Sequence, residues 1–402
     1  MNYDEVQELK FKHDIFEFNY IKPMAIRLYS KKTKLLLKCF IQAMLFEPDI
    51  ICKDNHSDVL ISYAFKFGIR KDYDSIILKL KSIVNNYNEI FFLYKLNIFK
   101  IPVNLYIFFK NFMFTDLKKR MSIKDRMKII SLGITIHKIK ETLEKINFKE
   151  KLLISFCDAH FEENILTQIF KKDCTRKAIT LQHGQYRFME NGSEDENTEA
   201  YMNFISDYIF VWGEKTKNEL IRGSVDSERI VIVGALKDFK RDKKEIIKNN
   251  IFCLILDGET NKNSNLSMIK LSNIISKKLN KKYFIRFHPM NKKTYYESYV
   301  LKDNYINSND SNQAEFFILH KTSVLLEMLR NNYKIFIYND ESQDDIFKID
   351  DILFSNYEEF QECYDKDIGF NYVELYKSFN IEDSLVELEI NYNSSIRKIM
   401  YK

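Results

Sequence analysis

The stretch KLLISFCDAHFEENILTQIFKKDCTRKAITLQHG, residues 151–184, decides the fold class. Residues 151–157 form a short, continuous apolar run, and residues 177–181 form a second one. Between them, EENILTQIFKK carries acidic residues in its first turn and lysines in its last, the order that a helix dipole favours. A strand, a helix and a second strand in this order predict a βαβ unit with parallel strands.

The same alternation continues toward the C-terminus. A strand, a helix and a strand are expected in SDYIFVWG, EKTKNELIRG and RIVIVGA, and the polar segment 241–250 is expected to be a linker. A second block then alternates strand–loop segments (IFCLILDGE, KYFIRFHP, FFILHKTS, KIFIYND) with helices in LSMIKLSNIISKKL and VLLEMLRNN. The sequence therefore predicts an α/β protein with two Rossmann-like domains facing a cleft. The expected boundaries are 1–240 and 241–375, followed by a helical tail, 376–402, that packs back on the first domain.

Bulk composition excludes several classes of protein. A chain of 402 residues can bury two cores, and its net charge of +5 does not demand a nucleic-acid partner. The six cysteines are scattered without a C-x-x-C pair, so neither a zinc knuckle nor a redox dithiol is indicated. The N-terminal residues MNYDEVQELKFKHD lack an apolar signal core, and no uncharged apolar run reaches the ~18 residues that a spanning helix needs. These features favour a reducing cytoplasm.

Residues 101–114, IPVNLYIFFKNFMF, leave two interpretations open. They precede the basic residues Lys118, Lys119 and Arg120. A buried strand or helix that ends in a solvated basic turn is favoured, because short apolar runs are usually core. A surface that contacts anionic lipid is the alternative.

Polar residues gather where the predicted strands end, the edge at which open α/β sheets bind ligands. They are Asp158, His160, Gln182, His183, Gly184, Gly213, Glu214, Gly234, Asp257, Gly258, His288, Pro289, Thr322 and Ser323. Thr322 and Ser323 precede a predicted helix, where hydroxyls and free amides bind anions. Arg286 and His288 would share one face if their strand continued. The Gly-rich dinucleotide fingerprint, the P-loop and the G-x-S-x-G elbow are all absent from the sequence.

A base that deprotonates an acceptor hydroxyl would come from the first half of the chain. Asp158 and His183 are the favoured candidates, and His160 is the third. Glu162 and Glu163 are interpreted as helix-start residues that complete the dipole.

Five short motifs in order give the chain a resemblance to a known group of enzymes. They are LQHGQY (181–186), DYIFVWGEKTKNEL (207–220), RIVIVGALKDF (229–239), FIRFHP (284–289) and HKTSVLLEML (320–329). Over about residues 150–340 the chain resembles GT-B glycosyltransferases of bacterial surface polysaccharides. It is most similar to the group of capsule Kdo-transferases, sialyl- and polysialyltransferases and teichoic acid polyolphosphate transferases. The GALKD turn lacks the proline that is usual in this group.

The resemblance implies a glycosyltransferase that moves a sugar from a nucleotide sugar to a capsule, lipopolysaccharide or other surface glycan. A CMP-sugar is favoured, and UDP-, GDP- or dTDP-sugars stay open. His288, Pro289, Thr322 and Ser323 would bind the donor phosphate, with Arg286, Asp257, Gly258, Gly213 and Glu327 also lining the donor site. The acceptor would be a glycan or lipid-linked glycan, with peripheral contact at the cytoplasmic face of the inner membrane as a possibility.

The resemblance also bears on the reaction. No metal is expected, because the D-x-D match Asp365 to Asp367 is late in the chain and does not follow a strand. Glu327 has no glutamate eight residues before or after it, which favours inversion. The alternatives are a CDP-glycerol-type polyol-phosphate transferase, a nucleotide-sugar-binding protein without turnover, and an epimerase.

Overall fold

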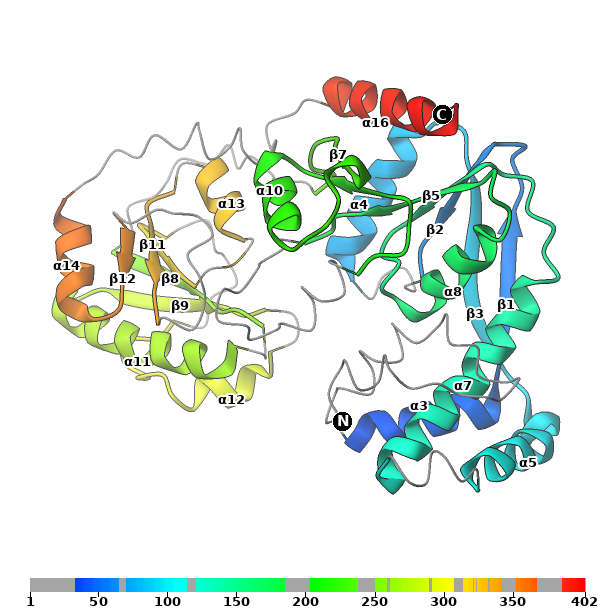
Figure 1. Ribbon diagram of the computed structural model, residues 1–402. Helices are drawn as coiled ribbons and strands as arrows, with labels where there is room; N and C mark the ends of the chain where they lie inside the picture. Colours follow the sequence, from blue (N-terminus) through cyan, green and yellow to red (C-terminus); the bar gives the residue numbers. More distant parts are fainter. Residues whose placement is uncertain are drawn as a thin grey trace. The chain divides into compact units, whose positions relative to one another are not determined.

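The computed structural model describes most of the chain (Figure 1). The described residues are 33–64, 70–113, 121–184, 203–237, 250–258, 261–288, 291–306, 314–320, 322, 324–331, 333–340, 352–366 and 385–401. They divide into two compact units. The first unit holds the described residues up to 237 together with 385–401, and the second holds those from 250 to 366. The expected linker at 241–250 lies outside the described residues apart from Asn250.

A seven-stranded sheet forms the centre of the first unit, in the order β1-β3-β2-β4-β5-β6-β7. Its strands are β1 (Phe46–Lys53), β2 (Val59–Ser62), β3 (Asn88–Leu96), β4 (Leu152–Ser155), β5 (Lys177–Leu181), β6 (Tyr208–Val211) and β7 (Ile230–Ile232). Six strands are parallel, and only β1 at the edge runs antiparallel, to β3. The βαβ unit expected in 151–184 is present as β4, α8 and β5.

Helices cover both faces of this sheet. They are α3 (Thr33–Leu45), α4 (Lys71–Ile83), α5 (Ile101–Phe112), α7 (Ile123–Leu143), α8 (Phe161–Phe170), α10 (Glu214–Arg222) and α16 (Leu385–Met400), with 3-10 turns η2 (Ile98–Lys100) and η3 (Ser227–Arg229). Side chains of the central strands alternate between two cores: Leu153 packs with α7 and α8, and Leu152 and Ile154 pack with α4 and α16. Because both faces are buried, these strands read as continuous apolar runs.

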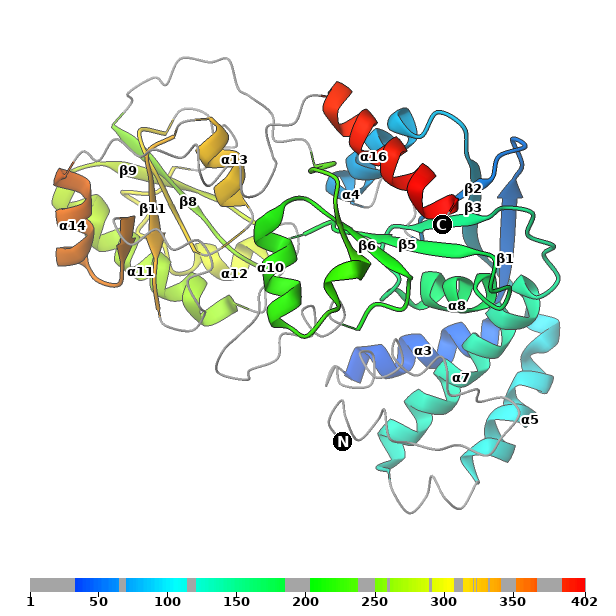
Figure 2. The ribbon, with the colours of Figure 1, turned by 45° about the horizontal axis from the view of Figure 1, so that its top comes forward.

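The C-terminal helix α16 lies against α4 in the first unit, and Figure 2 shows the two helices side by side. Leu388, Tyr392, Ile396 and Ile399 are buried in the core beneath this face. The Tyr392 hydroxyl donates to the carbonyl of Gly234, 3.5 Å away. Gly234 has φ 93°, a left-handed conformation that glycine adopts without the strain of a Cβ.

The apolar stretch 101–114 forms helix α5 up to Phe112. Asn104, Phe108 and Asn111 are buried, whereas an opposite face that includes Tyr106 and Phe109 is exposed. The expectation of a buried segment therefore holds for one face only. The basic residues 118–120 lie outside the described residues. No helix in the described ranges is both long and apolar enough to cross a bilayer.

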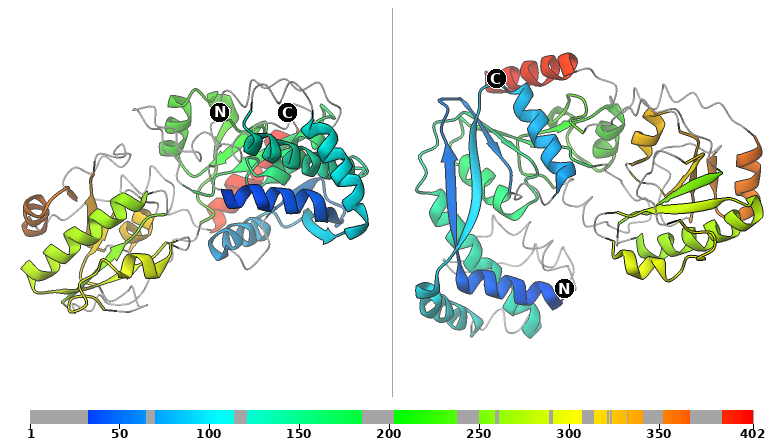
Figure 3. Two further views of the ribbon diagram at one scale, coloured as in Figure 1. Left: turned by 90° about the horizontal axis from the view of Figure 1, so that it is seen from below. Right: turned by 180° about the vertical axis from the view of Figure 1, so that it is seen from behind.

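The second unit has a five-stranded, wholly parallel sheet in the order β12-β11-β10-β8-β9. Its elements are β8 (Ile251–Ile255), α11 (Lys262–Leu279), β9 (Lys282–Arg286), α12 (Lys293–Glu297), β10 (Phe317–Leu319), α13 (Val324–Arg330), β11 (Ile335–Tyr338), β12 (Leu353–Phe354) and α14 (Tyr357–Asp365). Helices α11 and α14 pack together on one face of the sheet, and α13 lies on the other (Figure 3).

In both sheets the parallel strands begin at an inner strand and continue on both sides of it. In the first unit the chain passes from β2 to its neighbour β3 and then returns to the other side of β2 as β4. In the second unit β8 is followed by β9 on one side and by β10 on the other. Such reversals are topological switch points, where crevices open beyond the carboxyl ends of the strands. The molecule is thus an α/β protein with two Rossmann-like domains, as predicted, and each has its own switch point.

Candidate functional site

Aromatic rings and two histidines gather at the β2/β4 switch point of the first unit. Tyr63 follows β2 and Phe156 follows β4, and their ring centroids are 5.2 Å apart. His183, after β5, lies 4.7 Å from the ring of Phe156 and 6.2 Å from the ring of His160. Tyr73 from α4 meets the edge of His183 at 5.2 Å. The structure therefore brings together two of the three predicted base candidates, His160 and His183.

His160 is the N-cap residue of α8 and has a carboxylate beside it. Its Nδ1 lies 3.3 Å from Oε2 of Glu163, whose side chain is completely buried. The other oxygen of Glu163 accepts hydrogen bonds from the Phe156 amide at 2.9 Å and the Ser155 hydroxyl at 3.4 Å. Burial raises the pKa of Glu163, and the hydrogen bond and charge of His160 oppose that rise. His160 itself has a side chain that is 29% exposed.

Glu163 belongs to this cluster but was not among the candidate site residues predicted from the sequence. It does lie in the first turn of α8, as expected. Its side chain, however, turns back to the end of β4 and to the N-cap histidine. The one signal in the sequence is its spacing, because the third helical residue is the one that reaches back to an N-cap.

Asp158, one of the favoured bases, is buried, and its carboxylate is engaged in hydrogen bonds within the first unit. It is 2% exposed, and its Oδ2 accepts from the Ile205 amide at 2.9 Å. The same oxygen accepts from the amide and the hydroxyl of Ser206, at 2.7 and 2.6 Å. Three donors on one oxygen stabilise an ionised carboxylate that ties the end of β4 to the approach to β6.

The QHG turn, residues 182–184, mainly connects the end of β5 to the segment after β6 through hydrogen bonds of Gln182. Gln182 is buried, its Oε1 accepts from the Trp212 amide at 2.8 Å, and its Nε2 donates to Thr216 Oγ1 at 3.0 Å. His183 is 6% exposed, with Nδ1 3.4 Å from the Leu181 carbonyl. A Cβ at Gly184 would meet nothing within 4 Å, so lack of space does not explain the glycine. Gly213 is the buried, extended N-cap residue of α10, after β6 and away from the switch point.

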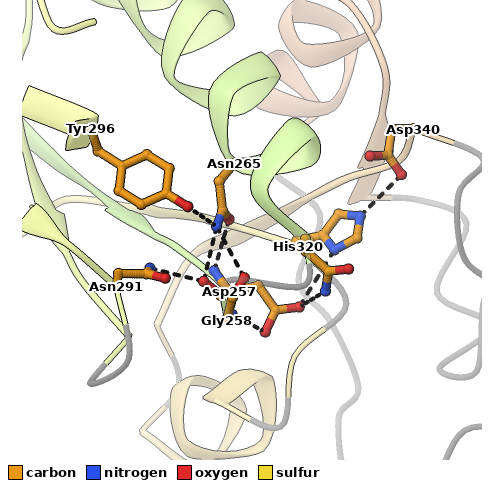
Figure 4. A network of polar contacts seen from close by, with 8 residues as sticks. Asp257, Gly258, Asn265, Asn291, Tyr296, His320 and Asp340 are labelled. Carbon is orange, nitrogen blue, oxygen red and sulfur yellow. Dashed lines mark hydrogen bonds and ion pairs between the residues drawn. The ribbon is translucent and has the colours of Figure 1, made fainter. Parts of the chain in front are cut away.

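A polar network occupies the β8/β10 switch point of the second unit (Figure 4). His320, directly after β10, is completely buried. Its Nε2 lies 3.1 Å from Oδ1 of Asp340, and its Nδ1 lies 3.8 Å from Oδ2 of Asp257. The imidazole thus stands between carboxylates that follow β11 and β8.

Two asparagines fix the backbone of the loop after β8. Asn265 accepts from the Asp257 amide at 2.9 Å and donates to the Asp257 carbonyl at 2.9 Å. Asn291 donates to the same carbonyl at 2.9 Å. The Asp257 carboxylate in turn accepts from the Gly258 amide at 2.8 Å. Asp257 and Gly258 were predicted for the donor site, whereas His320, Asp340, Asn265 and Asn291 were not.

The remaining predicted residues of the second unit are partly accounted for. Arg286 makes a bidentate pair with Glu327, at 2.9 and 3.2 Å, so the structure joins these two predicted residues. Because β9 ends at Arg286, the strand does not continue to His288, and the condition under which Arg286 and His288 would share a strand face is not met. Thr322 is buried, and its amide donates to the His320 carbonyl at 2.7 Å.

Helix α13 begins at Val324, where a helix was predicted, but it has only seven residues. Pro289 and Ser323 lie outside the described residues, as does Asp367 of the D-x-D match. Within the described part of the chain, no group of three or more His, Cys, Asp or Glu residues could hold a metal ion.

Comparison with known proteins supports the fold. No family model matches the sequence, and no curated protein matches it. Among solved structures it is similar to the UDP-GlcNAc 2-epimerase of Methanocaldococcus jannaschii, with 16% identity over 86% of this chain and 99% of that chain, and a TM-score of 0.50.

Two further solved structures are similar at the same level. The S. aureus MnaA–UDP co-structure has 10% identity over 86% of this chain and 98% of that chain, with a TM-score of 0.53. A putative UDP-N-acetylglucosamine 2-epimerase from Listeria monocytogenes has 11% identity over 85% and 96%, with a TM-score of 0.50. At these identities the similarity shows the fold alone, which is of the GT-B type.

Proposed function

We propose that this protein is an enzyme that acts on a nucleotide sugar and transfers the sugar to a glycan hydroxyl. The observation that carries the proposal is the partly exposed imidazole of His160, held by a buried carboxylate at a topological switch point. Perturbed titratable groups at such a crevice are typical of active sites.

The second unit is proposed to bind the donor. His288 and Thr322 follow β9 and β10 at the ligand-binding edge of the sheet, and the resemblance places the donor phosphate there. The charge of Arg286 is offset by Glu327, so phosphate recognition would depend more on His288 and on backbone amides than on the guanidinium. Asp257 and Gly258, fixed by the two asparagines, supply a preorganised loop beside it.

Among the three candidate bases, the geometry favours His160. Asp158 is occupied by three donors, and His183 is almost completely buried. In the proposed step the acceptor hydroxyl gives its proton to His160 as its oxygen attacks the anomeric carbon. The bond from that carbon to the phosphate oxygen breaks, and the nucleotide leaves with the electron pair. Direct attack of this kind inverts the anomeric configuration.

Nucleotide binding is the first test. Isothermal titration with CMP, CDP, UDP, GDP and dTDP should reveal a preferred nucleotide. His288→Ala should weaken its binding at least about tenfold, the equivalent of about 1.4 kcal/mol. His137→Ala is the matched control, because His137 lies on helix α7 and pairs with Glu141. Absence of binding by all five nucleotides would contradict the proposal. Equal activity with EDTA and with added Mg²⁺ would support a metal-independent reaction.

An epimerase is the second candidate, because two of the structural neighbours above are named UDP-GlcNAc 2-epimerases. NMR of a nucleotide sugar incubated with the protein in D₂O separates the two. An epimerase changes the sugar without an acceptor and incorporates deuterium if a proton is removed and returned. A transferase leaves the sugar carbons without deuterium and turns over only when the acceptor is present. A phosphodiester product would instead indicate a polyol-phosphate transferase.

The exposed face of α5 is proposed to contact anionic lipid. The exposed face of α5 carries Val103, Tyr106, Phe109 and Met113, with Lys100 and Lys110 beside them. Apolar side chains flanked by lysines suit the boundary of an anionic bilayer. A lipid-linked acceptor would be met at such a surface.

A further inference from the structure

We propose that Glu163 is a positioning residue that sets the tautomer and the proton affinity of His160. The geometry stands by itself, and only the role of His160 as base rests on the proposed function.

The carboxylate of Glu163 has fixed tasks. Oε1 accepts from the Phe156 amide and the Ser155 hydroxyl, which leaves Oε2 facing Nδ1 of His160 at 3.3 Å. Ionised, the carboxylate of Glu163 can only accept, and Nδ1 of His160 then carries the proton that is donated to it. In the neutral ring the lone pair then resides on Nε2, the nitrogen that a base would use.

Three other titratable groups in the described part of the chain belong to the surroundings of the ring. His183 lies on one side, and its protonation would oppose that of His160. Asp158 belongs to the same loop, with its carboxylate bound to Ser206. Burial holds the pKa of Cys157 well above its usual value, so its thiol is neutral and adds no charge. Compared with these groups of the described residues, Glu163 contacts the imidazole directly, with its Oε2 at 3.3 Å from Nδ1.

A role as an ordinary helix-start acid does not explain this placement. Glu162, its neighbour in the same turn, already supplies a negative charge there and accepts from the Tyr94 hydroxyl at 2.7 Å. A helix dipole is complemented from the surface, whereas burying a second carboxylate costs desolvation. The buried position is useful if the carboxylate must be rigid beside the imidazole.

The test compares Glu163→Gln with the matched control Glu162→Gln. In the first variant the glutamine oxygen can keep the bond to Phe156, and its NH₂ then faces Nδ1 and donates to it. The proton moves to Nε2, and the ring loses its base nitrogen. We expect kcat to fall at least about tenfold with a smaller change in KM, as for loss of general base catalysis. The acidic limb of the pH profile should move to lower pH. Glu162→Gln should keep the wild-type kcat and the wild-type pH profile.

Nitrogen NMR of ring-labelled histidine gives a readout that needs no activity. Wild-type His160 should show the Nδ1–H tautomer, and its titration should move to lower pH in Glu163→Gln. An Nε2–H tautomer in the wild type, or unchanged titration in the variant, would overturn the proposal even if Glu163→Gln folds poorly. If the tautomer is as expected but no nucleotide sugar reacts, the proposed function fails and the positioning role stands.

Discussion

The two sheets of this protein share a strand order but not a chemistry. In both, an inner strand is flanked by the next two strands of the chain, so a crevice is expected in the same topological place. The first unit fills it with rings, the buried carboxylates of Asp158 and Glu163, and two imidazoles. The second fills it with carboxylates, amides and one imidazole. Strand order therefore determines where a site forms, and the loop side chains determine what it can do.

The two carboxylate-bound histidines make the contrast sharper. His160 is partly exposed and can meet a substrate, whereas His320 is completely buried between Asp257 and Asp340. The same chemical pair thus serves a proposed catalytic role in one unit and a structural role in the other. Four measurements test this division, ordered by their expected effect on the free energy of unfolding.

Asp158→Ala should have the largest effect. It removes the acceptor of three hydrogen bonds in a buried place and leaves the Ile205 and Ser206 donors unpaired. We expect the free energy of unfolding to fall by about 3 kcal/mol, measured by urea denaturation. Asp226→Ala, at the exposed cap of η3, should cost at most about 1 kcal/mol. A stable Asp158→Ala protein without activity would return Asp158 to the role of base.

His320→Ala should come next. The change leaves a cavity at a completely buried side chain and removes a hydrogen-bond partner of Asp340. The expected loss is about 2 kcal/mol in the same assay, because a buried side chain and a charged hydrogen bond are lost together. His137→Ala, on the surface of α7, should change stability by less than about 0.5 kcal/mol. Equal free energies of unfolding for the two variants would mean that the network around His320 does not stabilise the fold of the second unit.

The raised pKa of Glu163 should be visible in the pH dependence of the free energy of unfolding. Burial raises its pKa in the folded state above the unfolded value, so the folded state holds the proton more tightly. This contribution to stability is fully present below the unfolded pKa and is lost as the pH rises through the folded pKa. The difference in the free energy of unfolding between wild type and Glu163→Gln should therefore decrease with pH, by at most about 1.4 kcal/mol per pH unit. Denaturation series in steps of half a pH unit would measure it, and a difference that rises with pH would contradict the assignment.

Phe109→Ser should have the smallest effect on folding. Its side chain is exposed on α5, so the free energy of unfolding should change by less than about 0.5 kcal/mol. Binding to vesicles with anionic phospholipid should nevertheless weaken several-fold in co-sedimentation, with little binding to neutral vesicles in either protein. Leu78→Ser on α4 is the matched control. Unchanged sedimentation of Phe109→Ser would exclude this face as the lipid contact.

The order of the elements could be predicted from the sequence, because each is encoded locally. The buried strands read as short apolar runs, and α8 is marked by acids at its start and a lysine just beyond its end. The strand ends also showed which polar residues belong to the two crevices, including His160, His183 and Asp257. The antiparallel edge strand β1 was not predicted, since its pairing with β3 spans about forty residues of other structure.

What the sequence determined by itself is therefore the α/β class, most of the strands and helices from residue 150 onward and the set of polar residues at the strand ends, because all three follow from local pattern. The short elements α12, β12 and α14 were not predicted. The tertiary structure alone decided the partners of those residues. His320 lies between Asp257 and Asp340 because β8, β10 and β11 are neighbours in the sheet, and strand order is not written in any local stretch. Likewise, only packing could show that Asp158 is enclosed by donors while Glu163, at the start of α8, turns inward to a histidine.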